Sequence, residues 1–460
     1  MKPKSNKKKK QQRLSKEKGA KRRTEKRTSK NDSKTALASL NVDELLNSAQ
    51  QAQNGFQTEA ACQLYQAAAI KLKTDNFAPP RRLISVLEQM GELKVSLGDL
   101  DGAKVDLTEA LQVLEAQPDN DKNVYAYHDI KANTYLTIGQ LCQEEGALES
   151  YRQGISNLEA CIQVLKSNPE TVISQDADMS DDNENKDQQH TQEQLLAELH
   201  QKLAGAHCTV AELYMTDLCY APTAESDCEQ HLTTALQITD ADGKPTIDAL
   251  QAMANLRLSQ AEERRPEAIP MILQAYYSKL KEGCDALAAL VGLSSQDDAK
   301  KEMTQDQAVE LNNVDAVNNL PEFEFRCQTS KLLLECASLP ACSSQQKTEL
   351  VEAAISVLGS LLAQNDEVIE IWYLLGCAFV ELPDSASLAK HYLSQAETMI
   401  RTMQKTLEQQ LACLPQDDDE ERPELEVELE DHRNQLEDVM DKLQQLGDVP
   451  DDDEGDDMEE

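Results

Sequence analysis

A recurring spacing of small and large apolar residues constrains the fold of this chain more than any other feature. In residues 371–379, IWYLLGCAF, Gly376 lies between Trp372 and Phe379 at helical spacing, so all three share one face. A glycine inside a helix costs about 1 kcal/mol relative to alanine. A glycine at this place therefore indicates that another helix approaches the backbone closely.

The same offsets return in other parts of the chain. A small residue is followed about twelve and nineteen residues later by two more, with large residues between, which is typical of the 34-residue tetratricopeptide repeat. The segments with this pattern are 45–68, 87–110, 135–161, 207–235, 250–275 and 370–396. The residues expected where the two helices of a repeat cross are Gly91, Ala103, Gly139 and Gly376, with Trp372 and Phe379 beside them.

A degenerate seventh repeat is expected from helical patterns at 321–338 and 344–363. Aromatic residues make up only 4% of the chain, and runs of alternating β-branched residues are absent. The sequence therefore predicts an all-α fold, a solenoid of about seven tetratricopeptide-type helical hairpins. Repeats that contact mainly their neighbours stack into a superhelix with a concave groove.

Composition predicts where the repeats are interrupted. Segments with many charges and few large apolar residues are expected to be disordered. The predicted organisation is a basic disordered segment 1–38, repeats one to three in 39–169, an acidic insertion 170–191, repeats four and five in 192–293, a second insertion 294–319, the last two repeats with an extension helix in 320–414, an acidic linker with a capping helix in 415–447, and an acidic tail 448–460.

The charge is distributed very unevenly. The net charge is −38, yet residues 1–34 carry 16 Lys and Arg against 3 Asp and Glu, so the remainder carries −51. The basic head resembles a two-cluster nuclear import signal, which would bind an importin, with Lys7, Lys8, Lys9, Lys10, Lys21, Arg22 and Arg23 as its clusters. Two alternatives stay open: contact with RNA phosphates, and folding back onto acidic neighbours. No nucleic-acid-binding fold is recognisable, and DNA binding is not expected.

The sequence contains no pattern typical of an enzyme. Nucleotide-binding, zinc-protease and serine-hydrolase motifs are absent, and the 12 cysteines form no C-x-x-C pair. There is no stretch of about 18 apolar residues and no apolar core in the first 30 residues, so neither a membrane span nor a signal peptide is expected. We therefore expect a soluble intracellular binding protein without catalytic, cofactor or metal sites.

The predicted groove is acidic. In tetratricopeptide repeats the groove is lined by certain positions of the first helix, and in the six clear repeats none of these positions holds Lys or Arg. The acidic residues at these positions are Asp43, Glu88, Glu92, Glu144, Glu212, Asp248, Glu370 and Glu381. A chain this acidic could place carboxylates on every face, which is the alternative reading. An acidic groove would attract a basic ligand.

Four segments of the sequence resemble those of a known family. These are AELYMTDLC at 211–219, DALQAMANLRLSQ at 248–260, KLLLECA at 331–337 and EIWYLLGCAF at 370–379. With the acidic tail, they make the chain, over about 40–450, resemble the dedicated assembly chaperones of large-subunit ribosomal protein four.

The resemblance implies a non-enzymatic chaperone. It would capture the extended basic loop of that newly made ribosomal protein in the cytoplasm, keep the protein soluble, and escort it to large-subunit assembly in the nucleus. The groove residues carried over from the best-matching motifs are Glu212, Asp248, Asn255, Glu370, Tyr373 and Glu381.

Two other classes of binding protein remain as hypotheses. Acidic tetratricopeptide proteins also chaperone histones, and the acidic insertion 170–191 suits that class. Adaptors for heat-shock chaperones bind acidic peptide tails through a clamp of Lys and Arg in the groove. The groove positions of the six clear repeats lack such a clamp, which argues against the adaptor class.

Overall fold

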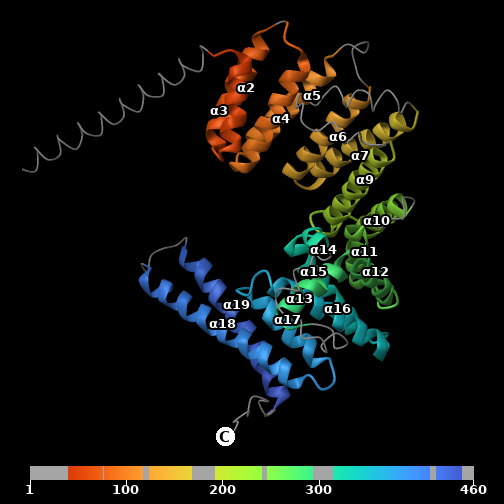
Figure 1. Ribbon diagram of the computed structural model, residues 1–460, viewed down its shortest axis with the longest axis vertical. Coiled ribbons are helices and arrows are strands. Elements are labelled where there is room, and N and C mark those ends of the chain that lie inside the picture. The colour runs from red at the N-terminus through yellow and green to blue at the C-terminus, as the bar shows by residue number, and fades with distance from the viewer. Residues whose placement is uncertain are drawn as a thin grey trace, which may run out of the picture. The chain divides into compact units, whose positions relative to one another are not determined.

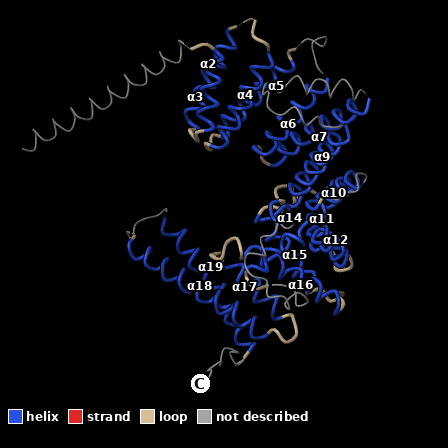
Figure 2. Tube along the Cα trace, viewed as in Figure 1, coloured by secondary structure: helices blue, strands red, loops and turns tan. Residues whose placement is uncertain are grey.

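The computed structural model describes residues 40–75, 77–117, 124–167, 192–240, 246–293, 314–414 and 421–447 (Figure 1). Within these ranges every regular element is a helix and there is no strand (Figure 2). None of the helices in the described ranges is long and apolar enough to cross a bilayer. The basic head with its seven import-signal residues, the insertion 170–191 and the tail 448–460 lie outside the described residues.

The chain divides into two compact units, Met1–Ala206 and His207–Glu460. The helices of the first unit are α2 (Val42–Asn54), α3 (Thr58–Thr74), α4 (Pro80–Ser96), α5 (Leu100–Glu115), α6 (Val124–Leu141) and α7 (Glu144–Ser167). Helix α9 (Gln192–Met215) begins in this unit and ends in the second.

The second unit continues with further helices. They are α10 (Ala224–Asp240), α11 (Ile247–Ser259), the 3₁₀ turn η2 (Arg265–Glu267), α12 (Ala268–Ala275), the π-helical turn η3 (Tyr276–Leu280), α13 (Lys281–Leu290), α14 (Val314–Asn318), α15 (Phe323–Ala337), α16 (Ser344–Leu362), α17 (Ile369–Val380), α18 (Ala386–Cys413) and α19 (Glu421–Leu446). Successive helices pack as hairpins, for example α4 with α5 and α17 with α18. The predicted all-α architecture of tetratricopeptide-type hairpins is confirmed.

Glycines lie where the two helices of a hairpin cross. A Cβ atom added at Gly91 would lie 2.9 Å from the side chain of Leu107, and one at Gly139 would lie 2.9 Å from the ring of Tyr151. At Gly376 the distance to Leu393 would be only 2.5 Å. Each contact joins the first helix of a repeat to its own second helix, and the predicted crossing residue Ala103 is fully buried.

Three aromatic rings surround the crossing of α17 and α18. The ring of Phe379 stacks on Tyr392 with 5.4 Å between centroids, and Trp372 lies 5.6 Å from the same ring. Phe379 and Tyr392 are buried, whereas Trp372 is half-buried. The two large residues predicted beside Gly376 therefore hold a tyrosine of the second helix between them.

The repeat formed by α9 and α10 keeps a small buried residue, Ala211, at the position of Gly376. His207 occupies the position that holds Trp372 in the last repeat, and its Nδ1 lies 2.8 Å from Nδ1 of His231 on α10. Burial lowers the pKa of His207 to about 4, and the nearby His231 adds to this effect. His207 is therefore neutral at pH 7.

The fifth repeat continues beyond its predicted second helix. Helix α12 continues through η3 into α13, which packs on α16. A Cβ added at Gly359 of α16 would lie 2.7 Å from Cβ of Ala288. The prediction of disorder over 294–319 was wrong at its end, because α14 forms there and the carbonyl of Ala316 packs against Gly283.

A buried arginine connects α10, α11 and η2. The side chain of Arg257 is 7% exposed, and its Nη2 lies 2.8 Å from Oε1 of Glu229. Glu229 also pairs with Arg264 at 2.8 Å, and Arg257 pairs with Glu267 at 2.8 Å. Hydrogen bonds from Arg264 and Arg257 lower the pKa of Glu229 to about 2. The carboxylate of Glu229 is therefore charged at neutral pH.

Candidate functional site

The first helices of the repeats contact one another in sequence within each unit, and we call the side chains at these contacts the first-helix face. In the second unit Gln251 of α11 donates to the carbonyl of Phe325 on α15 at 2.8 Å. Lys331 of α15 pairs with Glu370 of α17 at 2.8 Å. In the first unit Thr134 of α6 donates to Glu88 of α4 at 3.2 Å. The predicted ligand-binding residues thus lie on surfaces shared by neighbouring repeats.

Two carboxylates meet on this face between α9 and α11. Glu212 and Asp248 are both exposed, and neither has a Lys or Arg ion-pair partner in the described part of the chain. The pKa of Glu212 is raised, chiefly by burial of its surroundings and further by the charge of Asp248. Next to them, burial and both carboxylates raise the pKa of the Cys208 thiol to about 12. This part of the face is negative and lacks a counter-ion of its own.

Asn255 extends the same surface of α11. Its side chain is exposed, and its Nδ2 lies 4.0 Å from Sδ of Met215 at the end of α9. The amide can both donate and accept hydrogen bonds. Asn255 thus adds an exposed amide to the part of this face that carries Glu212 and Asp248.

A second group of carboxylates lies in the first unit. Glu88 is half-buried, and burial is the main cause of its raised pKa. The negative charges of Glu92 and Asp129 raise it further, while the hydrogen bond from Thr134 and the charge of Arg81 act in the opposite direction. Asp129, on α6, was not among the predicted residues, because only the fold brings it to Glu88.

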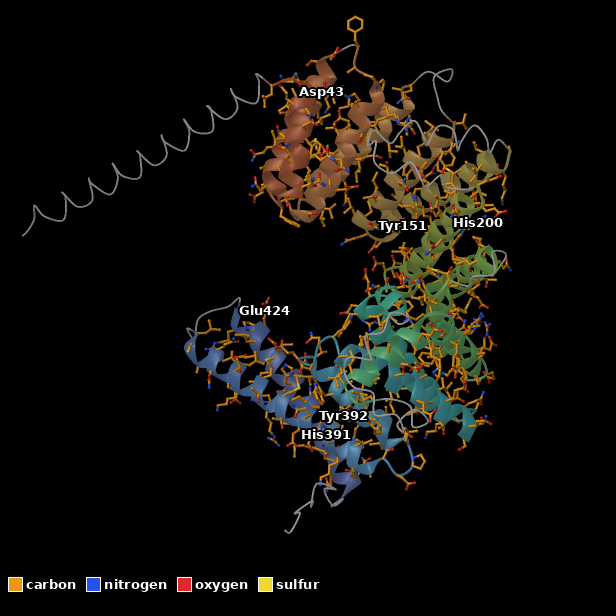
Figure 3. All side chains as sticks on the ribbon, viewed as in Figure 1. Asp43, Tyr151, His200, His391, Tyr392 and Glu424 are labelled. Atoms are coloured by element: carbon orange, nitrogen blue, oxygen red, sulfur yellow. The ribbon has the colours of Figure 1, made fainter. Side chains whose placement is uncertain are left out.

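Several other predicted residues are paired within the chain. Glu381 binds Lys347 at 2.5 Å, and Glu370 binds Lys331. Asp43 on α2, which is labelled in Figure 3, pairs with Arg82 of α4. The expectation of a face without basic residues was therefore incomplete. Lys331 belongs to the degenerate repeat, where the register could not be counted, and Lys347 lies on the second helix α16.

The capping helix contacts the predicted aromatic residue of the face. Tyr373 is half-buried and packs with the apolar residues that join α18 and α19. Nζ of Lys442 on α19 lies 5.9 Å from the centroid of its ring. Lys442 of the chain itself therefore already provides a cation at the ring of Tyr373.

Glu144 was placed wrongly. It is the first residue of α7, after α6 has ended at Leu141, and so it does not lie on the first helix of its repeat. Its φ of +50° belongs to the turn that joins the two helices. The third repeat has a shorter first helix than the spacing implied, and position thirteen therefore falls outside it.

In the described part of the chain no group of three or more His, Cys, Asp or Glu is arranged to hold a metal ion. The unpaired carboxylates form an electrostatic surface. Their arrangement attracts cationic side chains, and no nucleophile with a lowered pKa accompanies them.

Comparison with known proteins gives one curated relative. No protein-family profile matches the chain. A protein of Schizosaccharomyces pombe (strain 972 / ATCC 24843), described as "Probable assembly chaperone of rpl4", is 27% identical over 290 residues. The chain is similar to an assembly chaperone of rpl4. The match covers 63% of this chain and 61% of the relative, so the chain spans about three fifths of that protein's length. The resemblance indicated by the sequence motifs is confirmed.

Matches among solved structures include the assembly chaperone of RpL4, Acl4, residues 1–338. It is 22% identical with a TM-score of 0.47, over 74% of this chain and 95% of that one. Yeast Tom70 is 12% identical with a TM-score of 0.18, over 88% of this chain and 99% of Tom70.

Replacing Glu212 by glutamine is expected to raise the melting temperature at pH 7 by about 1–3 °C. A carboxyl whose folded-state pKa is raised stabilises the fold below its unfolded-state pKa, and this contribution is lost as the pH rises through the folded-state value. At pH 7 the ionised Glu212 therefore opposes folding, and a neutral amide removes this effect. Calorimetry at pH 7 and pH 4 measures the difference, which should shrink at pH 4.

The matched control for this prediction is Glu352→Gln, at an exposed carboxylate of the second helix α16. It should change the melting temperature by less than 1 °C or so, as is usual for surface substitutions. A lower melting temperature for Glu212→Gln would contradict the inferred environment of this carboxylate.

Proposed function

We propose that this chain is a non-enzymatic chaperone of a basic large-subunit ribosomal protein of the rpl4 type. The observation that carries the proposal is the pair of unneutralised carboxylates, Glu212 and Asp248, on the first-helix face. They support a basic ligand. The similarity to a probable assembly chaperone of rpl4 supports the choice of this ligand among basic proteins.

The proposed mechanism is charge neutralisation along an extended segment. Arg and Lys side chains of the ligand would pair with Glu212 and Asp248, and in the first unit with Glu88 and Glu92. A bound cation favours the ionised form of each carboxylate and so offsets the cost that raises its pKa. The net charge of −38 would increase the rate of association with a basic chain. A ligand covered in this way is kept from RNA and from aggregation.

We further propose that the complex forms in the cytoplasm and reaches the nucleus. The clusters at Lys7–Lys10 and Lys21–Arg23 support recognition by an importin. Deleting residues 1–34 from the chaperone alone tests which partner provides the dominant import signal. Nuclear accumulation of the complex should fall if the signal is in the chaperone. An acidic array is a poor ligand for nucleic acid, and the proposal includes no contact with DNA.

The test is co-expression of the full chain with an rpl4-type ribosomal protein. The ribosomal protein is expected in the soluble fraction only when the chaperone is present. The double charge reversal Glu212→Lys with Asp248→Lys should weaken the purified complex by roughly 10- to 100-fold, measured by fluorescence anisotropy of the labelled ribosomal protein. If the wild-type chain leaves the ribosomal protein insoluble, the proposed function is wrong.

A matched double variant separates the face from the overall charge. Glu282→Lys with Glu352→Lys makes the same change in net charge at exposed positions of α13 and α16. It should weaken binding less than about threefold, because solvent-exposed charges far from the ligand are screened. An equal loss of affinity in both double variants would show that the first-helix face is not the binding site. Tighter binding of histones than of the ribosomal protein would favour a histone chaperone.

A further inference from the structure

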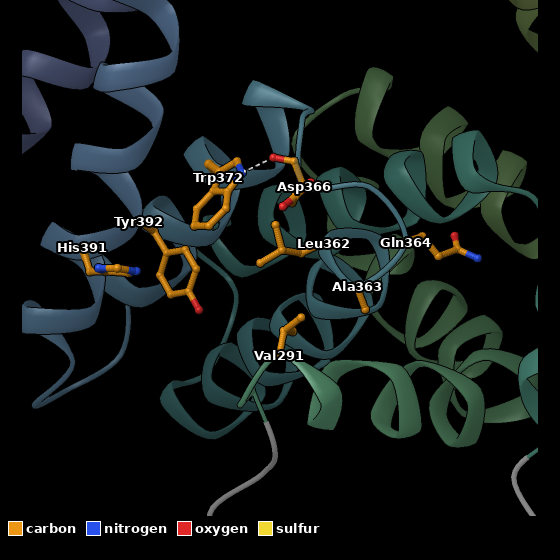
Figure 4. A pocket seen from close by; sticks show the side chains of 8 residues that line it. All are labelled: Val291, Leu362, Ala363, Gln364, Asp366, Trp372, His391 and Tyr392. Atoms are coloured by element: carbon orange, nitrogen blue, oxygen red, sulfur yellow. Dashed lines mark hydrogen bonds between the residues drawn. The ribbon is translucent and has the colours of Figure 1, made fainter. Parts of the chain in front are cut away.

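An aromatic pocket lies outside the first-helix face, between the end of α16 and the α17–α18 hairpin (Figure 4). Its volume is about 450 Å³. The residues that line it are Val291, Leu362, Ala363, Gln364, Asp366, Trp372, His391 and Tyr392. Trp372 and Tyr373 are adjacent in sequence, so on a helix they point about 100° apart. The pocket is therefore on a different side of α17 from the predicted client-binding residue Tyr373.

One polar group in this pocket lacks a partner. Tyr392 is only 7% exposed, and its hydroxyl makes no hydrogen bond to another described residue. Figure 4 shows this hydroxyl directed into the pocket, away from the indole of Trp372. The ring of Tyr392 is buried, but its hydroxyl oxygen is accessible from the pocket, which is the usual arrangement for an amphipathic tyrosine side chain. The pocket thus presents a hydroxyl that a ligand could satisfy.

The other polar groups at the pocket favour a cation. The exposed carboxylate of Asp366 has no ion-pair partner among the described residues, while its backbone carbonyl accepts the indole N–H of Trp372 at 2.8 Å. No Lys or Arg lines the pocket, and His391 is the one basic side chain in its lining. The buried Arg326 lies outside the lining and already donates to the amide oxygen of Gln364. The face of an indole is itself attractive to cations.

We propose that this pocket binds an arginine side chain of an extended basic peptide. The planar guanidinium can stack on Trp372 while its N–H groups donate to the carboxylate of Asp366 and to the hydroxyl of Tyr392. The aliphatic part of the side chain would contact Leu362 and Val291. Lysine has no planar group to stack and only a single charged nitrogen, so it fits this combination less well. This site is separate from the first-helix face and does not depend on which protein is the client.

The chain contains a built-in reporter, because Trp372 is its only tryptophan. The full-length protein is titrated with a blocked arginine–glycine peptide while tryptophan emission is recorded. A saturable change in emission is expected, with several-fold weaker binding of the lysine–glycine counterpart and no change with the citrulline counterpart. A carboxylate–guanidinium contact contributes enough that Asp366→Asn should weaken the arginine peptide about tenfold.

Three variants make the experiment specific to the pocket. Glu367→Gln removes the neighbouring exposed carboxylate, which does not line the pocket, and should change the affinity less than twofold. Tyr392→Phe keeps the ring that stacks on Phe379 and should weaken binding several-fold. Glu212→Gln with Asp248→Asn should leave the tryptophan response intact.

Three results would overturn the arginine pocket. The first is peptide binding, seen by anisotropy, without any change in tryptophan emission. The second is an unchanged affinity of Asp366→Asn. The third is an equal response to the citrulline peptide. A response that disappears only in the Glu212 and Asp248 variant would place the arginine on the first-helix face instead.

Discussion

Replacing Gly376 by leucine is expected to destabilise the second unit by about 1–3 kcal/mol, through overpacking of the crossing between α17 and α18. Even the first atom of a side chain would lie 2.5 Å from Cγ of Leu393 and 3.2 Å from its backbone nitrogen. The side chain of Leu393 is fully buried and the backbone of α18 is fixed by its own hydrogen bonds, so neither can move freely. Chemical denaturation followed by tryptophan fluorescence reports on this hairpin directly.

Alanine substitutions at two glycines give a test that depends only on whether each substitution raises or lowers the free energy of unfolding. Alanine is favoured over glycine in a helix by about 1 kcal/mol. Gly205 of α9 has open space where a Cβ would be added, so Gly205→Ala should stabilise the chain. Gly376→Ala gains the same helix propensity, but its Cβ would overlap with Leu393. This substitution is therefore expected to destabilise the chain. Stabilisation by both substitutions would mean that the helices do not cross at Gly376.

Replacing Glu229 by glutamine is expected to lower the free energy of unfolding of the second unit by about 3 kcal/mol at pH 7. Removing one partner of a buried ion pair leaves the other charge uncompensated, and this typically costs 3–5 kcal/mol. Arg257 is the buried partner and keeps Glu267 as its ion-pair partner and a hydrogen bond to Gln260. These contacts and the 30% exposure of the Glu229 side chain limit the effect to the lower end of this range. Urea denaturation of both proteins measures the difference.

The pH dependence of this difference provides an internal check. The folded-state pKa of Glu229 is lowered to about 2, so its stabilising contribution is complete above the ordinary value near 4.5 and is lost as the pH falls towards 2. The gap between wild type and Glu229→Gln should therefore narrow between pH 4.5 and pH 2. Glu263→Gln, at an exposed carboxylate of the same region, should differ from wild type by less than about 0.5 kcal/mol. A gap that stays constant with pH would show that the ion pairs do not cause the destabilisation.

The crossings of the hairpins could be predicted from sequence because they depend on local geometry. Helical periodicity places Gly376, Trp372 and Phe379 on one face, and the space that Leu393 needs is available only without a Cβ. The same kind of fixed offset from the small residue predicts Glu88 and Glu212 on the first-helix face, and their role in binding a ligand stays a prediction. Both have raised pKa values in the structure.

What could not be predicted depends on contacts between repeats. Lys331 and Lys347 neutralise Glu370 and Glu381 from the degenerate repeat, whose spacing gives no register. The position of Lys442 over Tyr373 depends on how α19 packs, which periodicity alone does not determine. Glu144 was misplaced because α6 ends earlier than the consensus length implies. The aromatic pocket was likewise missed, since Trp372 was interpreted only as a packing residue.

Helix α19 has a consequence for how copies of this protein meet. Its Val439 and Leu436 cover the apolar side of α18 around Ile400, which would otherwise be the surface on which a further repeat stacks. The exposed residues of α19 include acidic side chains such as Glu424 (Figure 3). A second copy would have to displace α19 and then bring like charges together. End-to-end polymerisation, the hazard of any modular array, is thus opposed by both sterics and charge at this end.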